Sequence, residues 1–283
     1  MRWQAVRVLG LGEGAEEGWG DMARQVVIAA LIDLGAGGVQ EEGDALVAYL
    51  PEEAGLAPVR SAVAGREGVS IESEALGEVD WGSMWTSRVG VQRLGRIVVA
   101  PPWCVAEAGD AEHVVVVEPG MAFGTGEHAT TRGMLRLIQR VIRGGHSVAD
   151  VGAGSAILSI AAAKLGATRV YAIESDGDAI GNAEANVTAN GVADRVCVLH
   201  GDAAVLLPLV APVGVVVANI ISSVLRGLEP VIRGAVSAGG CAILGGMLLS
   251  ERREMGGALA DGGWAQVAED CEGDWWSTVV VPR

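Results

Sequence analysis

The most constraining feature of this sequence is a short glycine turn between two apolar stretches. Residues 148–151 read as a strand that runs into Gly152-Ala153-Gly154, where residues without a Cβ allow a sharp turn and a close approach to a ligand. Residues 157–165 have apolar side chains at helical spacing, and 169–174 form a second apolar stretch ending in Glu174. This order predicts a strand–helix–strand unit with a ligand pocket at the strand ends.

Glu174 indicates that the ligand contains a nucleoside. It follows Gly152 by 22 positions, where an acid can accept hydrogen bonds from both ribose hydroxyls. NAD and S-adenosylmethionine both carry that ribose. A dinucleotide site would have a third glycine at the position of Ile157, so the turn favours S-adenosylmethionine. A tight turn in an unrelated α/β protein is the alternative interpretation.

A second glycine-rich segment, residues 118–132, lies upstream of this unit. It contains Phe123-Gly124-Thr125-Gly126 and runs into a predicted helix near Thr130. Backbone N–H groups of such a loop and of a helix start bind charged ligands. Thr130 and Thr131 are expected to cap the helix or to contact the cofactor carboxylate. His128 is expected to brace the loop by hydrogen bonds rather than to act as a base.

The chain after Glu174 continues to alternate helical and strand patterns. The predicted helices are 178–190, 224–236 and 250–260, and the predicted strands are 195–200, 214–221, 241–245 and 278–281. Apolar strands between helices indicate a parallel, Rossmann-like α/β sheet covered on both faces, with ligands at the carboxyl ends of the strands. Asp150, Glu174, Asp202 and Asn219 fall at those ends.

Residues 1–76 have a separate pattern. Strands at 3–8, 39–41, 45–50 and 69–72 alternate with helices at 23–34 and 52–64. This βαββαβ order predicts a small ferredoxin-like α+β domain. Residues 77–105, with Asp80, Trp81, Trp85 and the pair Pro101-Pro102, are expected to form a linker whose tryptophans pack rather than bind ligand. Residues 106–283 then form the larger domain.

The formal net charge of −15 limits the partners. Direct nucleic-acid binding is not expected, because phosphates require a basic surface. The acidic surface suits a basic protein partner, which Glu13, Glu16, Glu17 and Asp21 would attract, or serves solubility alone. Neither a membrane span nor a signal peptide is recognisable. Four scattered cysteines predict reduced thiols, no metal site and a cytoplasmic protein. The oligomeric state is left open.

Four segments carry a resemblance to a known family. They are Pro119 to Thr131, Asp150 to Ser155, Asn190 to Val192 and Val216 to Ile220. Over nearly its whole length the chain resembles the ribosomal protein L11 methyltransferase (PrmA) family, and the Phe-Gly-Thr-Gly-x-His loop is the most specific segment. The resemblance implies a substrate-recognition domain in residues 1–76 and a class I S-adenosylmethionine-dependent methyltransferase domain with a mostly parallel seven-stranded sheet.

The resemblance also implies site residues and a substrate. The family's S-adenosylmethionine contacts fall on Thr131, Gly152, Glu174 and Asn219, and Gly154 completes the glycine turn. The implied reaction is N-methylation of lysine or N-terminal amines of a basic ribosomal protein. The alternatives are methylation of another protein or a small molecule and, further off, an NAD-binding oxidoreductase. A departure from the family is Ala156, which stands where the family has glycine and is expected to narrow the cofactor pocket.

Asn219 is the predicted catalytic residue. A lysine amine has an ordinary pKa of roughly 10.4 and must lose its proton before it can attack a methyl group. The side-chain oxygen of Asn219 can accept an N–H and orient the lone pair of the neutral amine. Asp202 is expected to accept from the adenine amine or to be a simple turn residue. Asp150 either holds the turn or contacts the cofactor ammonium through water.

Overall fold

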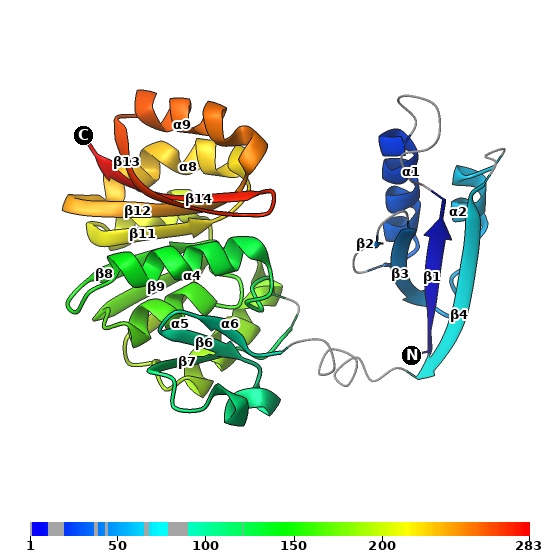
Figure 1. The fold of residues 1–283 in the computed structure, drawn as a ribbon, viewed down its shortest axis with the longest axis horizontal. Helices are drawn as coiled ribbons and strands as arrows, with labels where there is room; N and C mark the ends of the chain where they lie inside the picture. Colours follow the sequence, from blue (N-terminus) through cyan, green and yellow to red (C-terminus); the bar gives the residue numbers. More distant parts are fainter. Residues whose placement is uncertain are drawn as a thin grey trace. The chain divides into compact units, whose positions relative to one another are not determined.

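The computed structural model describes residues 2–10, 20–36, 39–42, 45–64, 68–78, 90–120 and 122–283. The chain divides into two compact units, residues 1–84 and 85–283 (Figure 1). Buried apolar side chains form one core cluster in the first unit and two in the second. The acidic positions Glu13, Glu16 and Glu17 and the predicted linker positions 80, 81 and 85 lie outside the described residues.

The first unit has the predicted βαββαβ order. Its elements are β1 (Arg2–Leu9), α1 (Gly20–Asp33), β2 (Val39–Glu42), β3 (Ala45–Pro51), α2 (Ala57–Ala62) and β4 (Ser70–Glu78). The sheet order is β2-β3-β1-β4 with antiparallel pairs throughout. Val6 and Val8 of β1 alternate with less buried residues and share a core with Val27 and Leu31 of α1. The ferredoxin-like prediction is confirmed.

The second unit begins with a small sheet in which the structure departs from the predicted linker. It consists of β5 (Gln92–Leu94), β6 (Ile97–Ala100) and β7 (His113–Val116), with the 3₁₀ helix η1 (Pro102–Ala108) after β6. All four residues of β6 are buried, and the strand pairs with β7 in parallel. Residues 90–105 therefore belong to the second unit, because Leu94, Ile97 and Val99 are part of its core.

The larger sheet of the second unit has seven strands in the order β10-β9-β8-β11-β12-β14-β13. The strands are β8 (Ser147–Val151), β9 (Arg169–Glu174), β10 (Val196–His200), β11 (Val213–Asn219), β12 (Val236–Leu248), β13 (Trp264–Glu272) and β14 (Trp275–Pro282). Strands β8 to β12 pair in parallel, and β14 is antiparallel to both of its neighbours. The predicted mostly parallel Rossmann-like sheet is confirmed.

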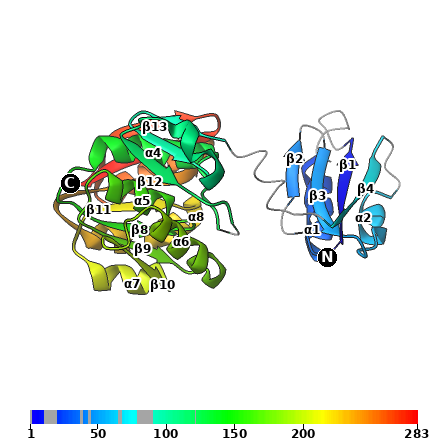
Figure 2. The same cartoon turned by 90° about the horizontal axis from the view of Figure 1, so that it is seen from below.

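Helices cover both faces of this sheet (Figure 1, Figure 2). They are α4 (Ala129–Val141), α5 (Ile157–Lys164), α6 (Gly177–Ala189), α7 (Ala203–Val210), α8 (Ser222–Ala235) and α9 (Arg252–Asp261), with the 3₁₀ helix η2 (Leu249–Glu251) before α9. Val215 and Val217 of β11 pack in one cluster with α4 and α5, while Val216 and Ala218 pack in the other with α8 and α9. Burial on both faces explains why β11 is apolar up to Ala218, before it ends in Asn219 at the cavity.

Strand β13 is the one strand of this sheet that the sequence did not reveal. It lies at the sheet edge, and most of its side chains are exposed or half-buried, with Trp264 as the buried exception. A half-polar edge strand lacks the apolar run by which the central strands were recognised. Its position became visible only through its pairing with β14.

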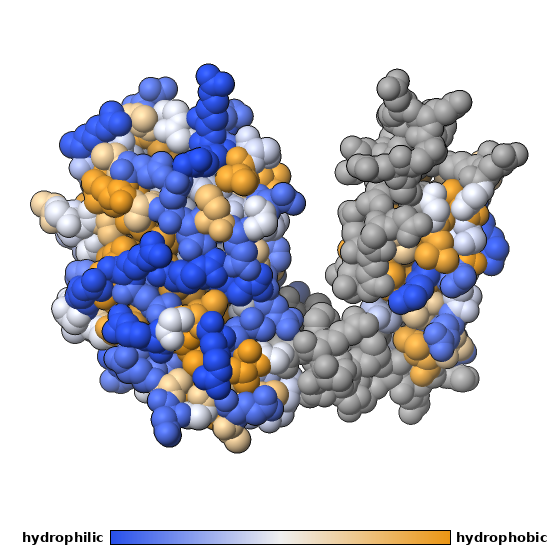
Figure 3. All heavy atoms as spheres, viewed as in Figure 1, coloured by the Kyte–Doolittle hydropathy of each residue, from blue (hydrophilic) through white to orange (hydrophobic). Residues whose placement is uncertain are grey.

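The visible face of the second unit carries mainly hydrophilic side chains with scattered hydrophobic patches (Figure 3). No helix within the described ranges is long and apolar enough to cross a membrane.

Candidate active site

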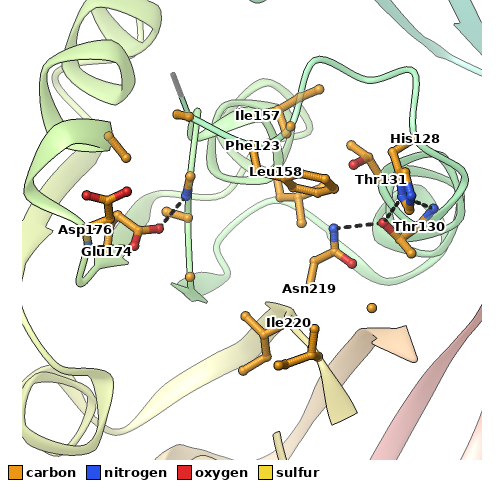
Figure 4. A pocket seen from close by; sticks show the side chains of 18 of the residues that line it. Phe123, His128, Thr130, Thr131, Ile157, Leu158, Glu174, Asp176, Asn219 and Ile220 are labelled. Carbon is orange, nitrogen blue, oxygen red and sulfur yellow. Dashed lines mark hydrogen bonds between the residues drawn. The ribbon is translucent and has the colours of Figure 1, made fainter. Parts of the chain in front are cut away.

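A cavity of about 550 Å³ opens at the carboxyl ends of β8, β9 and β11 (Figure 4). The structure brings five of the sequence-predicted site residues together in its wall: Thr131, Gly152, Gly154, Glu174 and Asn219. They come from the start of α4, the β8–α5 turn, and the ends of β9 and β11. The topology thus places residues up to 88 positions apart in the sequence around one space.

The β8–α5 turn is formed by backbone at positions where no side chain would fit. Gly152 and Gly154 have φ values of +71° and +52°. A Cβ at Gly154 would lie 2.5 Å from the carbonyl oxygen of Phe123, and one at Gly152 would lie 2.6 Å from Cγ2 of Ile220. The N–H of Ser155 donates to the same Phe123 carbonyl at 3.0 Å. The turn and the glycine-rich loop are therefore joined directly, and the requirement for glycine is steric.

Glu174 ends β9 and is 9% exposed. Its Oε2 accepts from the N–H of Gly154 at 2.8 Å, and its Oε1 accepts from the N–H of Asp176 at 2.9 Å. An ionised carboxylate has roughly four acceptor sites, so each oxygen keeps capacity for a further donor. The carboxylate thus braces the glycine turn and still presents acceptors to the cavity.

Two buried oxygen atoms in the cavity wall have no hydrogen-bond partner among the described residues. They are Oγ1 of Thr131 and Oδ1 of Asn219. The amide nitrogen of Asn219 is occupied, since it lies 3.4 Å from Oγ1 of Thr130. Because buried polar atoms are nearly always paired, these two oxygens indicate contacts that a ligand would complete.

His128 stands at the entrance to α4 and is the N-cap of that helix. Its ring makes edge-on contacts with the rings of Phe123 and Trp275, with centroids 5.4 and 4.9 Å away. Its Nδ1 lies 2.8 Å from Oγ1 of Thr130. Burial lowers the pKa of His128, and the nearby charge of Arg132 lowers it further. The contacts give His128 the bracing role expected from the sequence.

An ion-pair network that the sequence did not indicate holds the β13–β14 hairpin against α4. Nε of Arg132 donates to Glu272 at 2.8 Å, and the guanidinium of Arg136 donates to Asp270 at 2.6 and 2.8 Å and to Glu272 at 2.6 Å. The hydrogen bond from Arg132 is the main cause that lowers the pKa of Glu272. Trp275 follows the hairpin turn, so the network helps to place its ring in the cavity wall.

Asn186 of α6 and Asn190, the C-cap of this helix, hold the segment that leads into the glycine-rich loop. Oδ1 of Asn186 accepts from the N–H of Glu118 at 2.9 Å, and its Nδ2 donates to the carbonyl of Ser155 at 3.1 Å. Oδ1 of Asn190 accepts from the N–H of Val116 at 2.8 Å. Their spacing of four residues, which places them on one helix face, is the signal that could have identified them.

Asp202 lies outside the cavity lining, so its predicted contact with adenine is not supported by the geometry and stays a prediction. It is the N-cap of α7, is exposed, and accepts from the N–H of Ala204 at 2.8 Å. The alternative interpretation, a residue of the turn before a helix, matches this geometry. Ala156 is also outside the cavity wall: it is fully buried with φ +63°, so its methyl group points into the core.

Asp150 lies behind the glycine turn rather than in the cavity. It is 1% exposed, and its Oδ2 accepts from the hydroxyl of Ser159 at 2.7 Å, while its Oδ1 has no partner among the described residues. Burial raises the pKa of Asp150 to about 6. Its hydrogen bond joins β8 to α5, so of the two predicted roles the structure supports holding the turn.

The strand order and the cavity at the strand ends define a Rossmann-like domain of the class I methyltransferase type. The family model "Ribosomal protein L11 methyltransferase (PrmA)" matches residues 25–282. The chain therefore belongs to the ribosomal protein L11 methyltransferase (PrmA) family.

Individual relatives agree with this assignment. A ribosomal protein L11 methyltransferase of Pelotomaculum thermopropionicum is 38% identical over 207 residues, which cover 73% of this chain and 67% of the relative. The relative of the same name from Thermus thermophilus is 36% identical over 249 residues, 88% of this chain and 91% of its own length. The crystal structure of a ribosomal protein L11 methylase from Lactobacillus delbrueckii subsp. bulgaricus superimposes with a TM-score of 0.62 at 28% identity, covering 69% of this chain and 99% of that one.

Proposed function

We propose that this protein transfers methyl groups from S-adenosylmethionine to lysine or N-terminal amines of ribosomal protein L11. Family membership supports the reaction and the substrate. The observation that carries the site assignment is the pair of buried, unpartnered oxygens of Thr131 and Asn219, in one cavity with the glycine turn and Glu174. The two oxygens suit polar ligand atoms, and the glycine turn together with Glu174 suits a ribose.

The cavity residues fit S-adenosylmethionine by their chemistry. Glu174 would accept from the ribose hydroxyls with its remaining lone pairs, and the backbone at Gly152 and Gly154 would lie against the ligand where a Cβ is excluded. Thr131 would hold the amino-acid end through its free hydroxyl oxygen. When bound, the cofactor supplies an activated sulfonium methyl group.

Asn219 would act on the other reactant. Its Oδ1 would accept an N–H of the neutral amine, so that the nitrogen lone pair points at the methyl carbon. The amine so oriented would receive the methyl group that S-adenosylmethionine supplies, with the S–C bonding electron pair remaining on sulfur, and would then release a proton. The rings of Phe123 and Trp275 and the side chain of Ile220 line this part of the cavity, and apolar surroundings favour an uncharged amine.

The first unit, residues 1–84, is proposed to recognise the ribosomal protein. It contains none of the cavity residues and has a core of its own. The net charge of −15 favours a basic partner. Such attraction weakens with salt, because the Debye length falls from about 10 Å at 0.1 M to about 3 Å at 1 M.

Titration and methyl transfer test the proposal together. Calorimetry should show that the protein binds S-adenosylmethionine and does not bind NAD. Mass spectrometry of purified L11 after the reaction should show that its mass has increased in steps of one methyl group. A variant lacking residues 1–84 should keep its cofactor affinity and lose methylation of L11, after circular dichroism has established that it is folded. NAD binding without S-adenosylmethionine binding would replace the proposal with an oxidoreductase. Full-rate methylation by the truncated variant would remove the recognition role of the first unit.

A further inference from the structure

We propose that His128 and Thr130 set the direction of the Asn219 side-chain amide, so that its oxygen faces the cavity, and that protonation of His128 reverses this direction. The three side chains form one line of contacts in Figure 4. Nδ1 of His128 lies 2.8 Å from Oγ1 of Thr130, which lies 3.4 Å from Nδ2 of Asn219. The inference rests on the proposed methyl transfer to an amine, because it assigns positioning residues to that reaction.

The direction of the line is set at its outer end by the backbone. The N–H of Thr130 points at Nδ1 of His128 at 3.3 Å, as in a helix N-cap. A backbone N–H can only donate, so Nδ1 must present its lone pair. In a neutral imidazole the proton then resides on Nε2.

The next two contacts follow from this tautomer. The hydroxyl of Thr130 faces an Nδ1 that can only accept, so it donates its single proton there. Its oxygen can then only accept from Asn219, which must offer Nδ2. Oδ1 of Asn219 is left facing the cavity, buried and without a partner among the described residues. An acceptor is what the N–H of an attacking amine requires.

Protonation of His128 would invert each step. A proton on Nδ1 would bring two donors, Nδ1–H and the N–H of Thr130, face to face. The hydroxyl oxygen of Thr130 would then accept from the ring, and its proton would be donated toward Asn219. The amide would then turn its oxygen to Thr130 and its NH₂ group to the cavity. An N–H donor there would bind the amine lone pair that has to attack the methyl group, so the reaction would stop.

The surroundings of His128 favour its neutral form. Arg132 on α4 is the neighbouring cation, and its guanidinium is paired with Glu272 of β13. Glu127 precedes His128 in the chain, and its backbone carbonyl accepts from Arg132. The loop and β14 contribute only the rings of Phe123 and Trp275 to the contacts described for His128. Burial and Arg132 both lower the pKa of His128.

The first test reads the tautomer without any reaction. The full-length protein is labelled with ¹⁵N-histidine, and the His128 signals are assigned by comparison with His128→Asn. At neutral pH the ¹⁵N shifts should show a bare Nδ1 and a protonated Nε2. A proton on Nδ1 would overturn the proposal even if methyl transfer is normal. The expected tautomer in a protein that does not methylate L11 would instead count against the proposed function alone.

The second test separates two protons in the pH profile. In the wild type, log kcat/KM plotted against pH should have a slope of about two at pH values below the pKa of His128. Two protons are taken up there, one by the amine and one by His128, and each of them stops the reaction. Asparagine at position 128 can cap the helix with its oxygen but does not titrate. The slope for His128→Asn should therefore be about one, and its activity relative to wild type should rise about tenfold per pH unit on acidification. His146→Asn, a histidine outside the cavity, should keep a slope of about two. Equal slopes for wild type and His128→Asn would refute the proposal.

The third test removes the middle of the line. Thr130→Val keeps the shape of the side chain but has no hydroxyl, so kcat should fall about tenfold while the Kd for S-adenosylmethionine changes less than about twofold. Thr130→Ser restores the hydroxyl and should restore most of kcat. An equal loss in both variants would mean that the side-chain methyl group matters rather than the hydrogen bonds, and would overturn the role of Thr130.

Discussion

The two halves of the cavity are constructed differently. The half around Gly152, Gly154 and Glu174 consists mainly of backbone groups and comes from one stretch of about two dozen residues. The half around Asn219 consists of side chains from α4, β11 and β14. The first half suits a cofactor that is the same in every turnover. In the proposed reaction the second half orients the amine, which depends on the direction of individual hydrogen bonds.

The largest effect should come from the amine half. Asn219→Ala should lower kcat by about 100-fold, equivalent to about 2.7 kcal/mol, because the lone pair of the amine is no longer oriented. The Kd for S-adenosylmethionine should change much less, so the deficit appears in single turnovers at saturating cofactor. Ser222→Ala, at the start of α8 and outside the cavity wall, is the matched control. A near-normal single-turnover rate in Asn219→Ala would rule out the orienting role.

The converse pattern is expected from the cofactor half. Glu174→Gln keeps one acceptor oxygen but loses the charge, so calorimetry should show S-adenosylmethionine affinity reduced by about 1.5–3 kcal/mol, or roughly 10- to 150-fold. The turnover rate at saturating cofactor should stay within about threefold. Asp202→Asn, at the end of the neighbouring strand and outside the cavity, should alter the Kd less than about twofold. An equal loss in the two variants would restore the predicted adenine contact of Asp202.

The effect of Asp150, which holds the glycine turn of the cofactor half, on the free energy of unfolding should depend on pH. The pKa of Asp150 is raised to about 6 from its ordinary value of 3.8, so the folded state binds this proton more tightly than the unfolded state. The ionised carboxylate therefore destabilises the fold above about pH 6, by about 3 kcal/mol for a shift of about two units, and the penalty disappears as pH falls toward 4. Asp150→Asn should unfold at higher urea than wild type at pH 7, with the difference shrinking on acidification. A difference that is constant with pH would contradict this assignment.

The smallest effect is expected from Ala156→Gly. The left-handed conformation of Ala156 costs about 1–2 kcal/mol. Glycine removes that strain. Against this, the loss of the buried methyl group lowers stability by about 0.8 kcal/mol, and the greater conformational entropy of the unfolded chain lowers it by about 0.4–1 kcal/mol. Stability should therefore change by less than about 1 kcal/mol, and cofactor affinity by less than about twofold. A large gain in affinity would show that the methyl group does narrow the pocket, as expected from the sequence.

Local patterns were enough to predict the cofactor half. The G-x-G turn, the acid 22 positions beyond Gly152 and the apolar strands are all features of short segments, because one strand–helix–strand unit contains them. The βαββαβ unit was recognisable for the same reason. The sequence also pointed to Asn219, since parallel strands bring their carboxyl ends to one edge.

Tertiary structure alone decided the rest. It made Asp202 the N-cap of α7, placed residues 90–105 in the second unit, and joined Arg132 and Arg136 to a hairpin more than 130 residues away. It also aligned His128 and Thr130 with Asn219. These relations depend on which side chains meet across the sheet and in which direction each hydrogen bond runs. Local propensity and hydrophobic period contain no information on these contacts or on the direction of these hydrogen bonds, because they are decided only when distant segments pack together.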